Sequence, residues 1–246
     1  MSVTSETVHL DTPDGPMPCF EARPDVDGSA TRAGVIVIQE AFGVNDHIEE
    51  VARRFAAAGY HALAPHLFHR AGGGTAPYDD FAAVLPLFEG LTDAGILDDV
   101  DAARRRFAAV GITDHATGIV GFCFGGRVTF LAAVERELGA AAGFYGGGIV
   151  TARFPQFPSL VERVAELRTP WLGLFGDLDE SIPAEDVEVL RDALRTADQP
   201  TEVVSYADAG HGFFCEQRDA YNEGAARDGW ARTLAWFDHH LAPAEA

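Results

Sequence analysis

The sequence predicts an α/β fold in which helices cover both faces of a doubly wound, mostly parallel sheet. Short, continuously apolar runs, typical of strands buried on both faces, alternate with longer stretches of helical spacing. Loops that carry acidic residues, a cysteine and a histidine directly follow these runs, at the edge where open α/β sheets bind ligands. The 246 residues include no long linker and no internal repeat, so we expect one domain over 1–246.

The first half of the chain opens with a predicted β-hairpin. Residues 6–10 and 17–22 alternate in polarity on either side of Asp14-Gly15, which is a turn signal. The further elements expected here are a polar loop over 24–32, a buried strand over 34–39, a helix over 46–58, a strand over 60–64, a loop over 66–77 and helices over 79–88 and 95–110.

The second half repeats the pattern of strand, loop and helix. An apolar strand over 117–122 leads into a glycine-rich turn, and a helix is expected from 127 to 138. The elements that follow are strands over 140–145, 171–175 and 201–206 and helices over 160–167, 184–197 and 219–241.

Composition and charge exclude several classes of partner and site. The chain has 38 acidic and 18 basic residues, a net charge of −20, which argues against nucleic acid and anionic membranes as partners. Its three cysteines, Cys19, Cys123 and Cys215, match neither a zinc site nor a disulfide framework. Residues 1–12 are polar and acidic, unlike a signal peptide, and no apolar run approaches the ~18 residues of a membrane helix. We expect a cytoplasmic monomer or small homo-oligomer that acts on a small molecule.

The strand over 117–122 runs into Gly121-Phe-Cys123-Phe124-Gly125-Gly126, which has the form of a Gly-x-Ser-x-Gly nucleophile elbow with a thiol in place of the hydroxyl. Small residues two positions before and after the nucleophile make room for its strained turn. The backbone N–H of Phe124 is a candidate oxyanion donor. The alternatives are a buried structural cysteine and a nucleotide-binding loop, although Gly-x-Gly-x-x-Gly and Gly-Lys-Ser/Thr are both absent.

A thiol needs a base, and the candidate is His211, which glycines flank in the loop after the strand over 201–206. A surface histidine is the alternative. An imidazole in turn needs a carboxylate to fix its tautomer. We favour Asp179, four residues before Pro183, over Asp177, which would then be a turn or capping residue.

Glu40 ends the buried strand over 34–39, where a charge is costly unless it is partnered. It could hold the proton of the Cys123 thiol, or it could simply have emerged into solvent. If the loop after this strand approaches the thiol, the backbone N–H of Ala41 becomes a second candidate oxyanion donor.

Four motifs together resemble the dienelactone hydrolase family: Gln-Glu-x-Phe-Gly at 39–43, Gly-Phe-Cys-Phe-Gly-Gly at 121–126, Gly-Asp-x-Asp-x-x-Ile-Pro at 176–183 and Ala-Gly-His-Gly-Phe at 209–213. The resemblance implies an α/β-hydrolase fold and a triad of Cys123, His211 and Asp179. It also implies that Cys123 rests as a thiol near Glu40 and becomes a thiolate when substrate displaces this carboxylate. A thioester acyl-enzyme would follow, with no metal or organic cofactor.

The substrate end of the site departs from the family pattern. The family opens a dienelactone with arginines that bind its carboxylate, but one such position, four residues after the histidine, is Cys215 here. Arg218 and Arg70 are the candidate replacements, and either could be a solvated surface arginine. Tyr145, at the end of its strand, could line the pocket or pack in the core.

The function expected from these residues is hydrolysis of small, anionic esters or lactones. A general carboxylesterase or thioesterase on the same triad is one alternative. A non-catalytic protein of the same fold, which binds small ligands or senses oxidants through Cys123, is the other.

Overall fold

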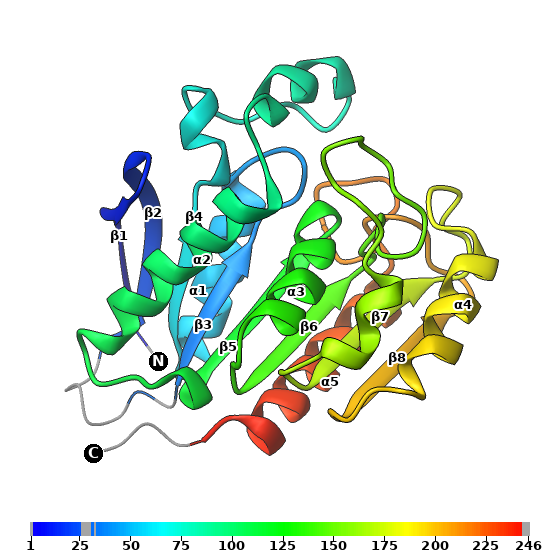
Figure 1. Cartoon of the computed structure of the whole chain (residues 1–246). Coiled ribbons are helices and arrows are strands. Elements are labelled where there is room, and N and C mark those ends of the chain that lie inside the picture. The colour runs from blue at the N-terminus through cyan, green and yellow to red at the C-terminus, as the bar shows by residue number, and fades with distance from the viewer. Residues whose placement is uncertain (1, 26–30, 32, 243–246) are drawn as a thin grey trace. The chain divides into compact units, whose positions relative to one another are not determined.

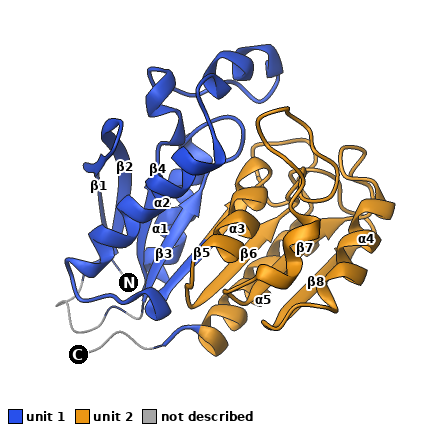
Figure 2. Cartoon of the chain, viewed as in Figure 1, with its two compact units in different colours: residues 1–119, 241–246 blue, residues 120–240 orange. Residues whose placement is uncertain are grey.

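We describe a computed structural model of the chain, which covers residues 2–25, 31 and 33–242. The chain divides into two compact units, which Figure 2 colours separately. Unit 1 comprises residues 1–119 and 241–246, and unit 2 comprises residues 120–240. Most of the loop expected over 24–32 lies outside the described residues. One domain over 1–246 therefore stays a prediction.

The strands of unit 1 begin with the expected hairpin, which is confirmed. Strand β1 (Val3–Thr12) pairs antiparallel with β2 (Gly15–Pro24), and Thr12 lies opposite Gly15 across the turn. Strand β2 pairs antiparallel with β4 (His61–Pro65), which pairs in parallel with β3 (Gly34–Ile38). The strand order in this unit is β1-β2-β4-β3 (Figure 1).

The helices of unit 1 pack on these strands. Helix α1 (Asp46–Ala57), capped by Asn45, contacts β2, β3 and β4, and helix α2 (Asp93–Ala108) contacts β1, β3 and β4. The described residues of this unit also form the 3₁₀ helices η2 (Leu67–Ala71), η3 (Phe81–Phe88) and η4 (Asp114–Ala116). The helix expected over 79–88 is thus a 3₁₀ helix, and Pro86 inside it cannot donate a backbone hydrogen bond.

Unit 2 has the strand order β5-β6-β7-β8 (Figure 1). Strand β5 (Thr117–Phe122) begins in unit 1 and ends in unit 2, and it is followed by β6 (Ala140–Phe144), β7 (Trp171–Gly176) and β8 (Thr201–Tyr206). Strands β6, β7 and β8 are parallel. The helices of this unit are α3 (Phe124–Glu135), η5 (Val161–Glu166), α4 (Ala184–Leu194) and α5 (Glu223–His240).

Helices α3 and α5 cover opposite faces of the strands in unit 2. A Cβ atom on Gly143 of β6 would lie 2.8 Å from Oγ1 of Thr129 in α3. The next residue, Phe144, has its ring against Gly229 of α5. Because successive residues of a strand point to opposite faces, the two helices lie on either side of β6. This arrangement agrees with the doubly wound sheet expected from the sequence.

Several element boundaries differ from expectation by a few residues, and two of these differences lie beside positive backbone φ angles. The helix expected from residue 127 begins at Phe124, because Cys123, at φ 54°, reverses the chain immediately before it. The strand expected to reach residue 145 ends at Phe144, and Tyr145 has φ 38°. Non-glycine residues adopt such angles at a cost, so both are points of local strain.

In the part of the chain that the structure describes, no helix is both long enough and apolar enough to cross a membrane.

Candidate active site

Cys123 sits at a tight turn between β5 and α3. Its backbone is strained, with φ 54° and ψ −115°, and its N–H donates to the carbonyl of Phe144 at 3.0 Å. A Cβ atom on Gly121, two residues before it, would collide with the backbone of Gly125, two residues after it. The small residues around the elbow are therefore required by a close approach of backbone to backbone, as the sequence indicated.

His211 lies in the loop after β8 and bridges Cys123 and Asp179. Its Nε2 atom is 3.1 Å from Sγ of Cys123, and its Nδ1 atom is 2.7 Å from Oδ2 of Asp179. The His211 loop is tied to the Asp179 loop by the N–H of Leu178, which donates to the carbonyl of Ala209 at 3.0 Å. The structure thus brings together three side chains that lie far apart in the sequence.

Asp179, not Asp177, is the carboxylate that contacts the histidine. Asp179 is 5% exposed and its Oδ1 atom accepts from the N–H groups of Ser181 and Ile182 at 2.8 and 3.1 Å. Asp177 is exposed, and its backbone N–H donates to Tyr206 at the end of β8. The geometry therefore matches the choice made from the spacing to the following proline.

The electrostatics of the cluster stabilise the imidazolium that His211 becomes when it takes up a proton, beside a charged carboxylate. Burial by itself would lower the pKa of His211, but its interactions with Cys123 and its hydrogen bond to Asp179 raise it to about 10. Burial would raise the pKa of Asp179, but His211 and the donors of Ser181 bring it below its ordinary value. A histidine in this state can hold a proton that comes from the thiol and return it later.

Ser181 is a polar member of this cluster that the sequence reasoning missed. Its Oγ atom donates to Oδ1 of Asp179 at 2.6 Å and lies 3.0 Å from Nδ1 of His211. A signal was present in the sequence, because a serine two residues after an aspartate is typical of a turn in which the carboxylate accepts local hydrogen bonds.

Other predicted site residues of unit 2 lie around the histidine. The ring of Tyr145 is fully buried and meets His211 edge-on at 5.1 Å between centroids. The guanidinium of Arg218 lies against Gly212, at φ 85°, where a Cβ atom would collide with it. Phe124, whose N–H is the candidate oxyanion donor, packs against Phe157.

The predicted site residues of unit 1 have different surroundings. Glu40 and Ala41 follow β3, and the side chain of Glu40 is fully buried, so the alternative of a solvated loop acid is wrong. The guanidinium of Arg70 donates hydrogen bonds within unit 1, to Asp14 at 2.6 Å, to Asp99 at 2.7 Å and to the carbonyl of Gly95 at 3.0 Å. These contacts weigh against a role for Arg70 in binding a substrate carboxylate.

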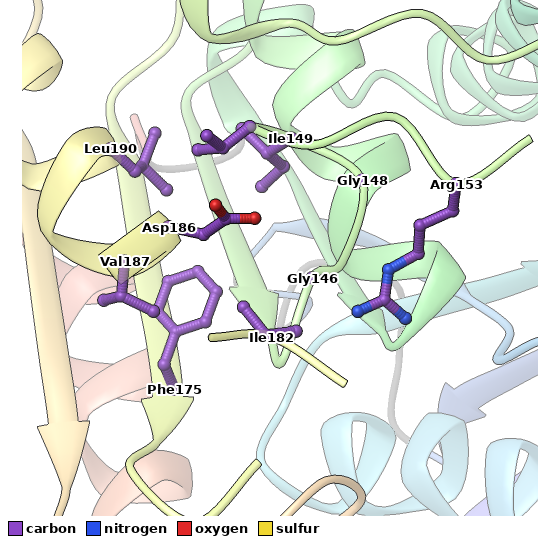
Figure 3. Close-up of a pocket in the computed structure, with 10 residues that line it drawn as sticks. Gly146, Gly148, Ile149, Arg153, Phe175, Ile182, Asp186, Val187 and Leu190 are labelled. Carbon is purple, nitrogen blue, oxygen red and sulfur yellow. The ribbon is translucent and has the colours of Figure 1, made fainter. Parts of the chain in front are cut away.

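A hollow adjoins the Asp179 loop within unit 2 (Figure 3). It holds about 260 Å³ between protein atoms, part of it open to solvent. Its walls are mostly apolar and include Ile149, Phe175 and Ile182, and it has a cationic and an anionic side chain, Arg153 and Asp186. It adjoins Asp179 through Ile182, whose N–H donates to that carboxylate.

Among the described residues, no group of three or more His, Cys, Asp or Glu could hold a metal ion.

Comparison with known proteins identifies relatives over nearly the whole chain. Residues 20–241 match the model of the dienelactone hydrolase family. A Salmonella typhimurium protein, provisionally named a carboxymethylenebutenolidase, is 42% identical over 228 residues, which cover 90% of this chain and 82% of the relative. The carboxymethylenebutenolidase of Rhodococcus opacus is 29% identical over 236 residues, covering 94% of this chain and 89% of that one.

Solved structures agree with these relatives. A Klebsiella pneumoniae protein, provisionally named a dienelactone hydrolase, superimposes with a TM-score of 0.90 at 37% identity and covers 97% of this chain and 99% of its own. The structure named m3DLH has a TM-score of 0.80 at 24% identity, covers 98% of this chain and all of its own, and shows the fold alone. The α/β-hydrolase fold expected from the sequence is confirmed.

Proposed function

Since the chain belongs to the dienelactone hydrolase family, we propose that this hydrolase cleaves small esters or lactones through Cys123, His211 and Asp179. The observation that carries the proposal is the continuous contact from Oδ2 of Asp179 through His211 to Sγ of Cys123, at 2.7 and 3.1 Å. Both distances lie within the range that a nucleophile, its base and an orienting carboxylate require, allowing for the larger radius of sulfur.

The reaction proceeds in two half-reactions. His211 accepts the thiol proton, the Cys123 thiolate attacks the ester carbonyl, and a tetrahedral oxyanion forms. The N–H of Phe124, and by prediction from the sequence that of Ala41, donate to this oxyanion. The oxyanion collapses to a thioester as His211 protonates the departing alkoxide. Water, deprotonated by His211, then attacks the thioester, releasing the acid and restoring the thiol.

We propose that the substrate carries a carboxylate and that Arg218 binds it. The guanidinium of Arg218 lies against Gly212, the residue next to the catalytic histidine, whereas Arg70 is held by Asp14 and Asp99. A planar guanidinium suits a carboxylate because it can donate two parallel hydrogen bonds. The dienelactone that gives the relatives their name is one member of this class.

Replacing the nucleophile tests the mechanism. Cys123→Ala should abolish ester hydrolysis in a folded protein, and mass spectrometry with a slowly hydrolysed ester should find the acyl group on Cys123 of the wild type. Cys19→Ala and Cys215→Ala serve as controls, because both thiols are fully buried, and they should retain most of the activity. Full turnover by folded Cys123→Ala would rule the mechanism out.

A panel of substrates separates the proposed reaction from a general carboxylesterase or thioesterase on the same residues. We expect kcat/KM to be highest for enol-lactones and esters with a free carboxylate, and lower for neutral aryl esters and acyl thioesters. A preference for thioesters would assign the same nucleophile to a different substrate class.

A further inference from the structure

The Asp179 carboxylate is held by more hydrogen bonds than its contact with the histidine alone. Its Oδ1 atom accepts from the backbone N–H of Ser181, the hydroxyl of Ser181 and the N–H of Ile182, at 2.8, 2.6 and 3.1 Å. Its Oδ2 atom is left for Nδ1 of His211 at 2.7 Å. Each oxygen therefore has a distinct partner set, and the rotation of the carboxylate is fixed.

The hydroxyl of Ser181 also faces the histidine, at 3.0 Å from Nδ1. A hydroxyl has a single proton, and Ser181 gives it to Asp179, so toward His211 it can present only lone pairs. The Nδ1–H of His211 thus points at two acceptors, Oδ2 of Asp179 and Oγ of Ser181. Both favour the tautomer with the proton on Nδ1, which leaves Nε2 to exchange a proton with Cys123.

We propose that Ser181 is a positioning residue. Its hydroxyl fixes the orientation of the Asp179 carboxylate and of the Nδ1–H of His211, so that Nε2 points at Sγ of Cys123. This inference rests on the proposed catalytic role of the three residues. The charged groups that act on the ring of His211 are Cys123 and Asp179, and its aromatic neighbour is Tyr145. Ser181 is the neutral, solvent-exposed group of the cluster.

The test compares Ser181→Ala with two matched variants. Ser181→Thr keeps the hydroxyl. Ser159→Ala removes a hydroxyl elsewhere in unit 2, where Oγ donates to the carbonyl of Ile149 at 3.0 Å. The rate readouts are kcat and KM for an aryl ester with a free carboxylate. The structural readout is an NMR titration of the His211 ring in the resting enzyme.

We expect Ser181→Ala to lower kcat by roughly 10- to 100-fold, the range for losing a hydrogen bond to a charged group, with KM changed by less than about twofold. The ring of His211 should lose its proton at a lower pH than in the wild type, because the oxygen lone pair of Ser181 that faces Nδ1–H at 3.0 Å is lost. Ser181→Thr and Ser159→Ala should both stay within about threefold of the wild-type kcat. A folded Ser181→Ala enzyme with wild-type kcat and an unchanged titration would overturn the inference.

A double-mutant comparison asks whether Ser181 acts through Asp179. In an Asp179→Asn background, Ser181→Ala should lower kcat by less than about a further threefold, because the carboxylate that Ser181 positions is already absent. If Ser181→Ala lowered kcat by the same factor in this background as in the wild type, the inference would be overturned.

The two readouts separate this inference from the proposed function. If the wild type hydrolyses no ester while Ser181→Ala still shifts the His211 titration, the proposed reaction fails and the role of Ser181 stands. If the wild type is active and Ser181→Ala changes neither readout, only the role of Ser181 fails.

Discussion

Replacing Asp179 by asparagine removes one charge and exchanges one acceptor for a donor. The asparagine can keep Oδ1 where it accepts from the N–H groups of Ser181 and Ile182, at 2.8 and 3.1 Å in the native protein. Its NH₂ group then takes the place of Oδ2, 2.7 Å from Nδ1 of His211. Two donors cannot share this contact, so the histidine moves its proton to Nε2 or withdraws from the contact.

Either response disables the base, and the size of the loss follows from the tautomer. With a proton on Nε2, the ring has no lone pair toward Sγ of Cys123, 3.1 Å away. The same exchange in a serine triad lowers kcat by about 10⁴, equivalent to ~5.4 kcal/mol of barrier. We expect a loss of up to about 10⁴ in Asp179→Asn. The free energy of unfolding should fall by only ~1 kcal/mol, because the backbone hydrogen bonds to Oδ1 survive.

The assay is kcat for an aryl ester with a free carboxylate, alongside urea unfolding of the same preparations. Asp177→Asn is the matched control, two residues away on the exposed side of the turn, and it should stay within about threefold of the wild-type kcat. If Asp177→Asn were the slower enzyme, or if Asp179→Asn kept the wild-type kcat, the assignment of the carboxylate would be refuted.

Three further predictions concern the thiol, the substrate and pH. If Glu40 holds the proton of the resting Cys123 thiol, as the family resemblance implies, Glu40→Gln should slow hydrolysis yet leave iodoacetamide labelling of Cys123 equal or faster, because the substitution also removes a repelling charge. A parallel fall in hydrolysis and labelling would show instead that Glu40 promotes the thiolate. Arg218→Ala should lower kcat/KM by more than about tenfold for carboxylate-bearing esters but not for neutral ones, and Arg70→Ala should not discriminate between them. Because the pKa of His211 is raised from 6.5 to about 10, its contribution to stability is complete below pH 6.5 and lost as pH rises through 10. The difference in urea unfolding free energy between the wild type and His211→Asn should therefore shrink over that range.

The strands were the most predictable part of the fold. The strand expected over 117–122 matches the fully buried β5 residue for residue, and the strand expected over 201–206 matches β8, none of whose residues is buried. The 3₁₀ helices were not foreseen as such, because over eight residues the spacing of apolar side chains barely separates a 3₁₀ helix from an α-helix. In η3, moreover, Phe81 and Leu85 are each 54% exposed, so the apolar pattern there does not follow burial at all.

The site was predictable where chemistry and topology agree. Motif-bearing loops at the carboxyl ends of parallel strands must meet, so Cys123, Asp179 and His211 could be brought together from the sequence. The contact of Ser181 with His211 could not be predicted in this way, because the two residues are 30 positions apart in the sequence and the local signal concerns only the turn at Asp179. The hydrogen bond from Arg70 to Asp14 could not be foreseen either, because the two residues are 56 positions apart in the sequence.

Gly176 offers a test of how the loops set the distances within the site. A Cβ atom on this last residue of β7 would collide with the carbonyl of Ala209, so Gly176→Ala must push the His211 loop away from the Asp179 loop. A displacement of about 1 Å can cost ~100-fold in rate, so we expect a fall in kcat of at least about tenfold although no reacting atom is changed. Gly210→Ala is the control: it lies next to His211, but its Cβ atom would meet the carbonyl of Leu178 at an ordinary 3.7 Å. It should be nearly as active as the wild type. If Gly210→Ala proved the more damaging change, nearness to the histidine would matter more than the backbone contact between the loops, and this account of the site's geometry would be wrong.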